Sequence, residues 1–410
     1  MVRLVLSVAV GLVTGLPAVT PADVAFRHDV LRPGTAAQAG LRPAPIGELR
    51  DVAAAHLRPT PDHPGHPSYA GATVLAAHHG IVVARFAVGD AVRYTATAAG
   101  IAELPPARRV PARVDTIWDL ASLTKLFTTI VVLQQVQAGR VGLDAPVAAY
   151  VPEFAAGGKA AVTVRQLLTH TSGLPAFRPL YATEPTPAAR LAAALRTPVT
   201  PGTTPGRQYV YSDLGMIALG VLVERVTGRR LDRVVHDGVT GPLGMRDTGY
   251  RPGRAARHRI AATEYQPHVH RGLVRGVVHD ENAWALGGVA GHAGIFATVD
   301  DLAVLCQTLL DGGEYHGHRI LSAAMVRAAL TANPGGRGLG FELAARTYMG
   351  GLTSPVTFGH TGFTGTSVVI DPVRQSFLIL LSNRVHPDRA WGTDTAARRA
   401  LADAFAAAHP

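Results

Sequence analysis

The sequence contains a single cysteine, Cys306, among its 410 residues. One cysteine excludes an intrachain disulfide framework and any metal site built on a Cys-x-x-Cys pair. Cys306 stands among Leu302, Leu305 and Leu309 at helical spacing. We therefore predict that its thiol is buried in an apolar environment.

Lysine is almost as scarce, since only Lys125 and Lys159 accompany 37 arginines. The formal net charge is +10, but the arginines are dispersed and nowhere form a run longer than two residues. A nucleic-acid-binding protein is expected to gather its basic residues on one face, so this composition argues against such a partner. Charged residues make up 17% of the chain and apolar residues 47%, which excludes a disordered chain and permits a large core.

Long apolar runs are also missing, because no later stretch reaches the roughly 18 uninterrupted apolar residues that a membrane span requires. The first residues, with Arg3 followed by the apolar stretch 4–16, resemble a secretory signal. We predict a signal peptide over residues 1–22 and an exported protein, periplasmic or extracellular. Because the segment offers no clean cleavage site, a cytoplasmic protein stays open as the alternative.

Strand patterns lie near both ends of the chain, and helical patterns lie between them. The expected strands are apolar, mostly β-branched runs at 72–77, 81–87, 367–370 and 377–381. The expected helices cover 120–138, 214–226, 301–310 and 395–407. Asp119 can cap the first helix, Gly228 ends the second, and residues 298–301 form a capping box for the third.

This order predicts an α+β fold in which one antiparallel sheet, built from the N- and C-terminal segments and flanked by helices, carries an inserted, mainly helical lobe. We expect one domain over 23–410. Its sheet lobe comprises about 68–115 and 335–410, and its helical lobe about 116–334. The cleft between the two lobes is the expected place for a functional site.

The first expected helix opens with Ser122-Leu-Thr-Lys125, which places Ser122 and Lys125 on one face. A hydroxyl in the first turn faces the positive end of the helix dipole, which favours a developing alkoxide. A neighbouring amine that is held neutral can accept the serine proton, whereas an arginine stays protonated and cannot. The spacing also arises by chance, so by itself it is moderate support for nucleophilic catalysis.

Two further motifs follow in order, Tyr211-Ser212-Asp213 before the second helix and His360-Thr361-Gly362 before a strand. With these motifs the chain, over roughly residues 70 to 400, resembles the serine β-lactamase and penicillin-binding protein superfamily. The resemblance is to the class C and D-alanyl-D-alanine carboxypeptidase branch, whose signatures are Ser-x-x-Lys, Tyr-x-Asn and Lys-Thr-Gly or His-Thr-Gly. Other stretches that look similar to that branch are 167–174, 242–245 and 287–294.

The resemblance implies roles for the motif residues. Ser122 would be the acylated nucleophile, Lys125 its partner in proton transfer, and Tyr211 a general base or acid. The backbone N–H groups of Ser122 and Phe363 would form the oxyanion hole. The residues implied to line the bound substrate are Asp213, His360, Thr361 and Gly362.

Two departures from the family pattern bear on the substrate. Asp213 stands where penicillin-recognising members have an asparagine, and an ionised carboxylate can only accept hydrogen bonds. It can instead pair with Lys125 and favour the charged amine. His360 stands where many β-lactamases have lysine, and a neutral imidazole attracts a carboxylate less strongly. Both departures favour an esterase or a peptidase over an efficient β-lactamase.

A second polar cluster, residues 279–282, precedes a glycine-rich loop at 287–294. Its glycines permit the backbone to approach a ligand, so His279 and His292 are candidate substrate contacts, although a purely structural loop explains them equally well. The loop carries no phosphate-binding signature. Despite 18 histidines, no His-Glu-x-x-His motif is present, so we expect no metal.

We therefore predict a cofactor-independent serine hydrolase that forms an acyl-enzyme on Ser122, an esterase or a D-amino-acid peptidase. The expected substrate is a small ester, amide or peptide. The alternative hypothesis is a β-lactamase or a D-alanyl-D-alanine carboxypeptidase. The non-enzymatic hypothesis is a catalytically silent binding protein for cell-wall peptides. The motifs leave the natural substrate and the oligomeric state open.

Overall fold

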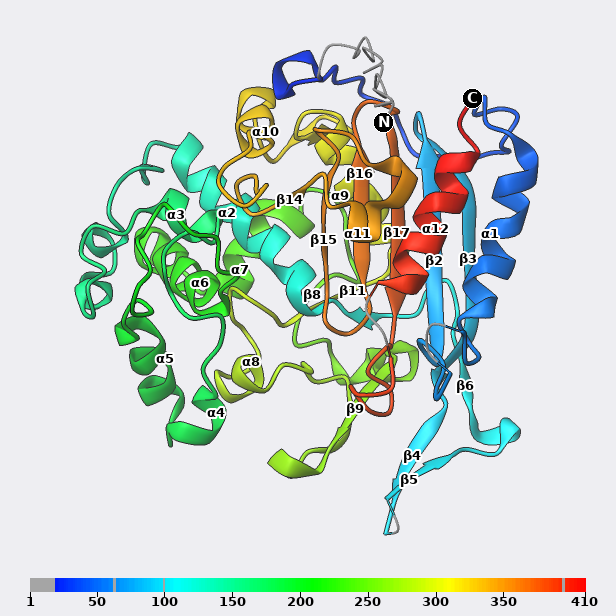
Figure 1. Cartoon of the computed structure of the whole chain (residues 1–410), viewed down its shortest axis with the longest axis horizontal. Coiled ribbons are helices and arrows are strands. Elements are labelled where there is room, and N and C mark those ends of the chain that lie inside the picture. The colour runs from blue at the N-terminus through cyan, green and yellow to red at the C-terminus, as the bar shows by residue number, and fades with distance from the viewer. Residues whose placement is uncertain (1–18, 62–63, 99, 393–394) are drawn as a thin grey trace, which may run out of the picture.

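The computed structural model describes residues 19–61, 64–98, 100–392 and 395–410. Its centre is an eight-stranded sheet in the order β1-β3-β2-β17-β16-β15-β14, with β6 paired to β3 (Figure 1). The strands are β1 (Arg32–Pro33), β2 (Gly71–His78), β3 (Ile81–Val92), β6 (Val110–Pro111), β14 (Glu342–Leu343), β15 (Phe358–Thr361), β16 (Ser367–Asp371) and β17 (Ser376–Ser382). Strand β17 pairs antiparallel with both β2 and β16, so the two ends of the chain form one sheet, as predicted.

Both faces of this sheet are covered, and every residue of β17 is buried. Helices α1 (Pro43–Ala55) and α12 (Ala396–Ala407) lie side by side on one face (Figure 1). There Leu378 and Leu380 pack with Leu401 and Phe405. The intervening residue Ile379 points to the opposite face and joins the main core, because successive side chains of a strand alternate between faces.

The helical lobe surrounds α2, which is buried along nearly its whole length. Its helices are α2 (Thr124–Gln137), α3 (Val164–Leu168), α4 (Leu180–Thr183), α5 (Pro187–Arg196), α6 (Asp213–Thr227), α7 (Leu231–Val235), α8 (Glu281–Ala285), α9 (Val299–Leu310) and α10 (Ala323–Ala329). Helix α11 (Arg346–Met349) belongs to the sheet lobe, where it packs against α12. Short strands complete the fold: β4 (Tyr94–Thr97), β5 (Gly100–Glu103), β7 (Trp118–Asp119), β8 (Gly249–Tyr250), β9 (Ala262–Gln266), β10 (Gly272–Arg275), β11 (Ile295–Ala297), β12 (Glu314–Tyr315) and β13 (His318–Arg319).

The predicted helices form, with shifted boundaries. The first begins as a 3-10 turn, Ala121–Leu123, before α2, and the Asp119 carboxylate accepts a hydrogen bond from Ala121 N–H instead of capping α2. Gly228 ends α6 with a φ of 67°, and the Thr298 hydroxyl caps α9. The Cys306 thiol is buried, as predicted.

One helix was not predicted, and one predicted segment cannot be compared with the structure. Helix α1 has no counterpart among the expected elements. The predicted signal peptide, 1–22, falls almost entirely outside the described residues. Within the described ranges, no helix is long and apolar enough to cross a membrane.

Removing the Phe405 ring tests how firmly α12 holds the sheet. Phe405 is fully buried in the cluster between α12 and the strands, so Phe405→Ala is expected to lower the free energy of unfolding by about 3–5 kcal/mol. Val373→Ala is the control. Because Val373 is about half exposed, this change is expected to alter the free energy of unfolding by less than about 0.5 kcal/mol. Urea denaturation of both variants measures the difference, and equal losses would contradict the assigned packing.

Candidate active site

Ser122 lies at the junction of the two lobes, in the 3-10 turn that precedes α2. Its neighbours Ala121 and Leu123 are buried while Ser122 is partly exposed. Ala121 has a φ of +47°, a left-handed conformation that costs a residue other than glycine roughly 1 kcal/mol or more. The surrounding contacts therefore hold this turn in a conformation that presents the Ser122 hydroxyl.

Lys125 is buried one helical turn later, with 1% of its side chain exposed. Its Nζ donates hydrogen bonds to Ser122 Oγ at 2.8 Å and to the His292 carbonyl oxygen at 3.0 Å. It also forms an ion pair with Asp213 Oδ1 at 2.8 Å. Two hydrogen bonds and one ion pair thus fix the position of the ammonium group.

The Asp213 ion pair decides the charge of Lys125. Burial alone would lower the pKa of the amine, but the negative charge of Asp213, aided by Tyr211, raises it above the usual value. Lys125 is therefore an ammonium ion in the resting protein. This charge state agrees with the sequence-based suggestion that Asp213 favours the charged amine.

Tyr211 is the second side chain beside Ser122, with its ring centre 5.0 Å from Lys125 Nζ. Burial raises the pKa of its phenol, and the Lys125 charge opposes that rise. The ring lies against His170, at 4.6 Å between ring centres. His170 Nδ1 also accepts a hydrogen bond from Ser212 N–H, so the 167–174 stretch positions the tyrosine.

The glycine-rich loop reaches the site mainly through its backbone. The His292 carbonyl binds Lys125, and the Gly291 carbonyl accepts a hydrogen bond from the Thr128 hydroxyl. A Cβ atom on Gly291 would lie 2.1 Å from the Met216 carbonyl oxygen, so only glycine permits this approach to α6. The loop therefore packs against α6 and, through the His292 carbonyl, fixes the Lys125 side chain that extends from α2.

The imidazoles of His279 and His292 both line the cavity beside Ser122, but each ring already has a carboxylate partner. His279 Nε2 lies 2.8 Å from Glu264 Oε2, and His292 Nε2 lies 2.8 Å from Asp280 Oδ1. Their predicted role as substrate contacts stays a prediction.

Strand β15 and the turn after it form the opposite wall. A Cβ atom on Gly362 would lie 2.4 Å from the Leu120 carbonyl oxygen, so the glycine permits close approach to the turn that carries Ser122. Burial lowers the pKa of His360 well below its usual value, which makes it a neutral imidazole at neutral pH. Thr361 lines the same wall.

Two cavities meet at Ser122, Tyr211 and Phe363. The acyl cavity, as we name the first, has a volume of about 380 Å³. It is further lined by Ala121, Phe177, Tyr181, Asp213, His279, Asp280, Glu281, His292, Ala293 and Arg389. The basic cavity, as we name the second, has a volume of about 260 Å³ and is further lined by Tyr209, Arg337, Glu342, His360, Thr361, Gly362 and Arg398.

Sequence reasoning missed the two arginines of the basic cavity. Arg398 sits on the inner face of α12 beside Ala397, Leu401 and Phe405, and an arginine in such an apolar stripe is a signal that could have found it. Arg337 lies in an irregular segment before β14, where no periodic pattern marks it.

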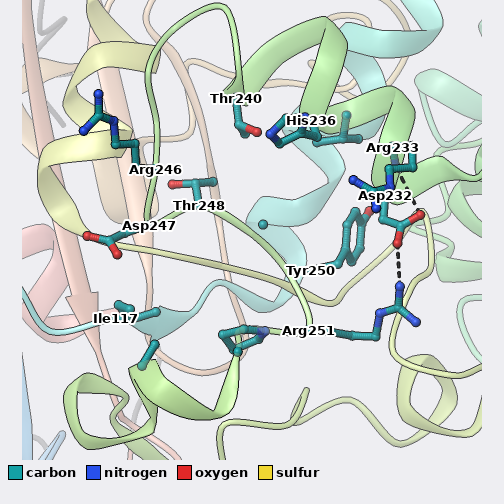
Figure 2. Close-up of a pocket in the computed structure, with 15 residues that line it drawn as sticks. Ile117, Asp232, Arg233, His236, Thr240, Arg246, Asp247, Thr248, Tyr250 and Arg251 are labelled. Atoms are coloured by element: carbon teal, nitrogen blue, oxygen red, sulfur yellow. Dashed lines mark hydrogen bonds and ion pairs between the residues drawn. The ribbon is translucent and has the colours of Figure 1, made fainter.

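A third cavity of about 360 Å³ lies elsewhere in the molecule. Figure 2 shows its lining, in which Arg251 forms an ion pair with Asp232 at 2.5 Å. None of the three sequence motifs contributes to it. Among the described residues, no group of three or more histidine, cysteine or acidic side chains is placed to hold a metal ion.

This chain is similar to known proteins both in sequence and in architecture. The model of the Beta-lactamase family matches residues 66–403. The chain belongs to the beta-lactamase family. A protein of Escherichia coli K12, provisionally named D-alanyl-D-alanine carboxypeptidase, is 35% identical to this chain over 356 residues. The aligned residues cover 78% of this chain and 79% of that protein.

Two solved structures share the family's fold with this chain. A penicillin-binding protein homologue from Caulobacter crescentus has a TM-score of 0.66 at 23% identity and covers 90% of this chain and 99% of its own. A hydrolase with promiscuous acyltransferase activity has a TM-score of 0.65 at 21% identity and covers 88% of this chain and 99% of its own. The fold-class prediction is thereby confirmed.

Glu264 tests the ion-pair network behind the acyl cavity. Burial alone would raise its pKa, but hydrogen bonds from His279 and Arg389 hold it at about 2. A depressed carboxylate pKa stabilises the fold above the unfolded pKa, and this stability is lost as pH falls toward the folded pKa. We therefore expect Glu264 to contribute about 3 kcal/mol at neutral pH, lost between about pH 4.5 and 2.

Urea denaturation at several pH values measures this contribution. Glu264→Gln is expected to lower the stability at neutral pH and to flatten its acid dependence. The exposed Glu48 on α1 provides the control Glu48→Gln, which is expected to follow the wild type. An unchanged acid dependence in Glu264→Gln would show that the carboxylate is not held ionised by these partners.

Proposed function

We propose that this protein is a serine carboxypeptidase of the beta-lactamase family that removes a C-terminal D-amino acid through an acyl-enzyme on Ser122. The observation that carries the proposal is the basic cavity beside Ser122, which is lined by Arg337 and Arg398. A guanidinium is suited to a carboxylate, and a free carboxylate is what distinguishes a peptide's C-terminal residue. The carboxylate of the leaving group would occupy this cavity.

The hydrogen bonding of Arg337 supports this assignment. Its side chain is 8% exposed, and its Nη2 donates to Glu342 Oε1 at 2.8 Å. Its Nη1 and the His360 Nε2 are buried, and neither has a hydrogen-bond partner among the described residues. Buried polar atoms normally have partners, so a bound carboxylate would supply the acceptor that Arg337 lacks.

The reaction would proceed in two steps. Ser122 Oγ attacks the scissile carbonyl carbon while Tyr211, in its phenolate form, takes the hydroxyl proton; the resulting phenol gives that proton to the leaving amine as the C–N bond breaks. The backbone N–H groups of Ser122 and Phe363 would bind the developing oxyanion. Water then attacks the acyl-enzyme carbonyl: one water proton passes through Tyr211 to Ser122 Oγ as the ester bond breaks, and the shortened peptide leaves as an acid that ionises to a carboxylate and releases its proton to solvent.

The charge of Lys125 assigns this proton transfer to Tyr211. An ammonium ion paired with Asp213 cannot accept a further proton, but it lowers the cost of a Tyr211 phenolate. Tyr211 would therefore carry the proton while Lys125 stays charged. The D configuration of the substrate is supported by the provisional name of the Escherichia coli relative.

An esterase is the second candidate, and the acyl cavity favours it. Phe177, Tyr181 and Phe363 give this cavity an aromatic wall, with Phe177 46% and Phe363 42% exposed. Such a wall fits an apolar acyl group. Efficient β-lactam hydrolysis is less well supported, because Asp213 cannot donate the amide hydrogen bond of the family's asparagine.

Replacing Arg337 tests the proposal. The substrates are a peptide ending in D-alanyl-D-alanine and its C-terminal amide. Wild type is expected to prefer the free acid. Arg337→Met is expected to lower kcat/KM for the acid by about 10- to 100-fold, because it removes a charge-assisted hydrogen bond to the carboxylate. The kcat/KM for the amide is expected to stay unchanged. Arg346→Met, on an exposed residue of α11, is the control.

The outcomes separate the candidates. Equal loss on both substrates would contradict carboxylate recognition by Arg337. Hydrolysis of p-nitrophenyl esters without cleavage of either peptide would favour the esterase. Ser122→Ala is expected to abolish every activity, and a wild-type protein that cleaves nothing and forms no acyl-enzyme would be the silent binding protein.

A further inference from the structure

Asp119 is a buried carboxylate close to Ser122 that lines neither of the two cavities at Ser122. It ends strand β7, three residues before Ser122, and is 2% exposed. Strand β7 pairs with β11, which places Asp119 opposite Phe296. Because Asp119 lines neither cavity, it does not contact a substrate bound there, and its hydrogen bonds to neighbouring groups are its route to the site.

Those groups belong to three separate segments. Asp119 Oδ1 accepts a hydrogen bond from Ala121 N–H at 2.9 Å. Asp119 Oδ2 accepts one from His279 N–H at 2.6 Å. Its backbone carbonyl oxygen accepts a third from the Thr364 hydroxyl at 2.7 Å.

Each segment carries part of the proposed machinery. Ala121 is the left-handed residue directly before Ser122. His279 precedes Asp280, which binds the ring of His292, whose carbonyl holds Lys125. Thr364 follows Phe363, the second proposed oxyanion donor.

We infer that Asp119 is a positioning residue that sets the mutual placement of Ser122, Lys125 and the Phe363 amide. The inference rests on the proposed acyl-enzyme function. A carboxylate suits this task because it has two acceptor oxygens and no donor. Two N–H groups from different segments can therefore converge on one side chain, and the Leu120 carbonyl, bound by the Thr366 hydroxyl at 3.0 Å, extends the same clamp.

Asp119→Asn breaks the clamp with little change in volume. An asparagine has one acceptor oxygen, so its NH₂ group would face either Ala121 N–H or His279 N–H, donor against donor. One of the two segments must then shift. Because displacing reacting groups by about 1 Å can cost about 100-fold in rate, we expect the acylation rate constant to fall by about 10- to 100-fold.

The test is a stopped-flow burst experiment with p-nitrophenyl acetate on wild type and Asp119→Asn. A positioning role predicts a burst amplitude close to one per folded protein with a slower burst rate constant. A merely structural role predicts the reverse, a smaller amplitude with an unchanged rate constant, and that result would overturn the inference. Asp301→Asn is the matched control, since Asp301 also accepts a backbone N–H, that of Asp247 at 2.9 Å, and lines neither cavity.

A second variant covers the case in which Asp119→Asn does not fold. Thr364→Val removes the hydroxyl that binds the Asp119 carbonyl and keeps the side-chain volume. It is expected to slow the burst by about 3- to 10-fold at full amplitude, and an unchanged burst rate would count against the clamp.

Amide hydrogen exchange makes the inference independent of the proposed function. A wild type that shows no burst with any activated ester would end the acyl-enzyme proposal but leave the clamp testable. Faster exchange in segments 120–124, 279–282 and 362–366 of the variants is expected, and unchanged exchange in all three would overturn the inference.

Discussion

The site depends on one buried ion pair, that of the Lys125 ammonium with Asp213. The other lysine shows what the pair achieves. Lys159 is also buried, and its Nζ donates to the Ala156 and Thr197 carbonyl oxygens. No carboxylate of the described residues pairs with it, so burial lowers its pKa to about 8. Lys125 is just as buried, yet Asp213 raises its pKa. A buried charge is costly unless it is paired and hydrogen-bonded, and here the pairing keeps a permanent cation beside Ser122 and Tyr211.

This cation organises segments from most of the chain. Its partners come from the turn before α2, from the start of α6 and from the glycine-rich loop. Two glycines permit the close backbone approaches that bring these segments together, Gly291 against α6 and Gly362 against the Ser122 turn. The proposed catalytic groups are therefore held by backbone contacts as well as by their own side chains, and a preorganised site requires such rigidity.

The sequence predicted the parts of this arrangement that local spacing encodes. Their spacing of three residues brings Ser122 and Lys125 together, although Ser122 lies in the 3-10 turn before α2 and not on the helix itself. The antiparallel sheet follows from apolar runs near both ends of the chain. The 121–123 turn was less predictable, since Ala121 in a left-handed conformation depends on tertiary contacts. Helix α1 was missed because it starts with Pro43 and Pro45 and has only a weak apolar face.

The long-range contacts could not be read from spacing at all. Arg337 reaches the basic cavity from 23 positions before His360 only because β14 and β15 pair, and Asp119 meets His279 across 160 residues of sequence. The roles of Asp119, Arg337 and the His292 carbonyl arise from where the fold brings distant segments together. The motifs point to the proposed reacting groups, and the fold brings the proposed substrate-binding and positioning residues to them.

The proposed reaction requires that Ser122 reacts covalently as a nucleophile. Treatment with a fluorophosphonate, followed by intact-protein and peptide mass spectrometry, measures this reactivity. We expect one adduct per protein, on the peptide that contains Ser122, and none in Ser122→Ala. An unmodified protein, or an adduct on another residue, would contradict it.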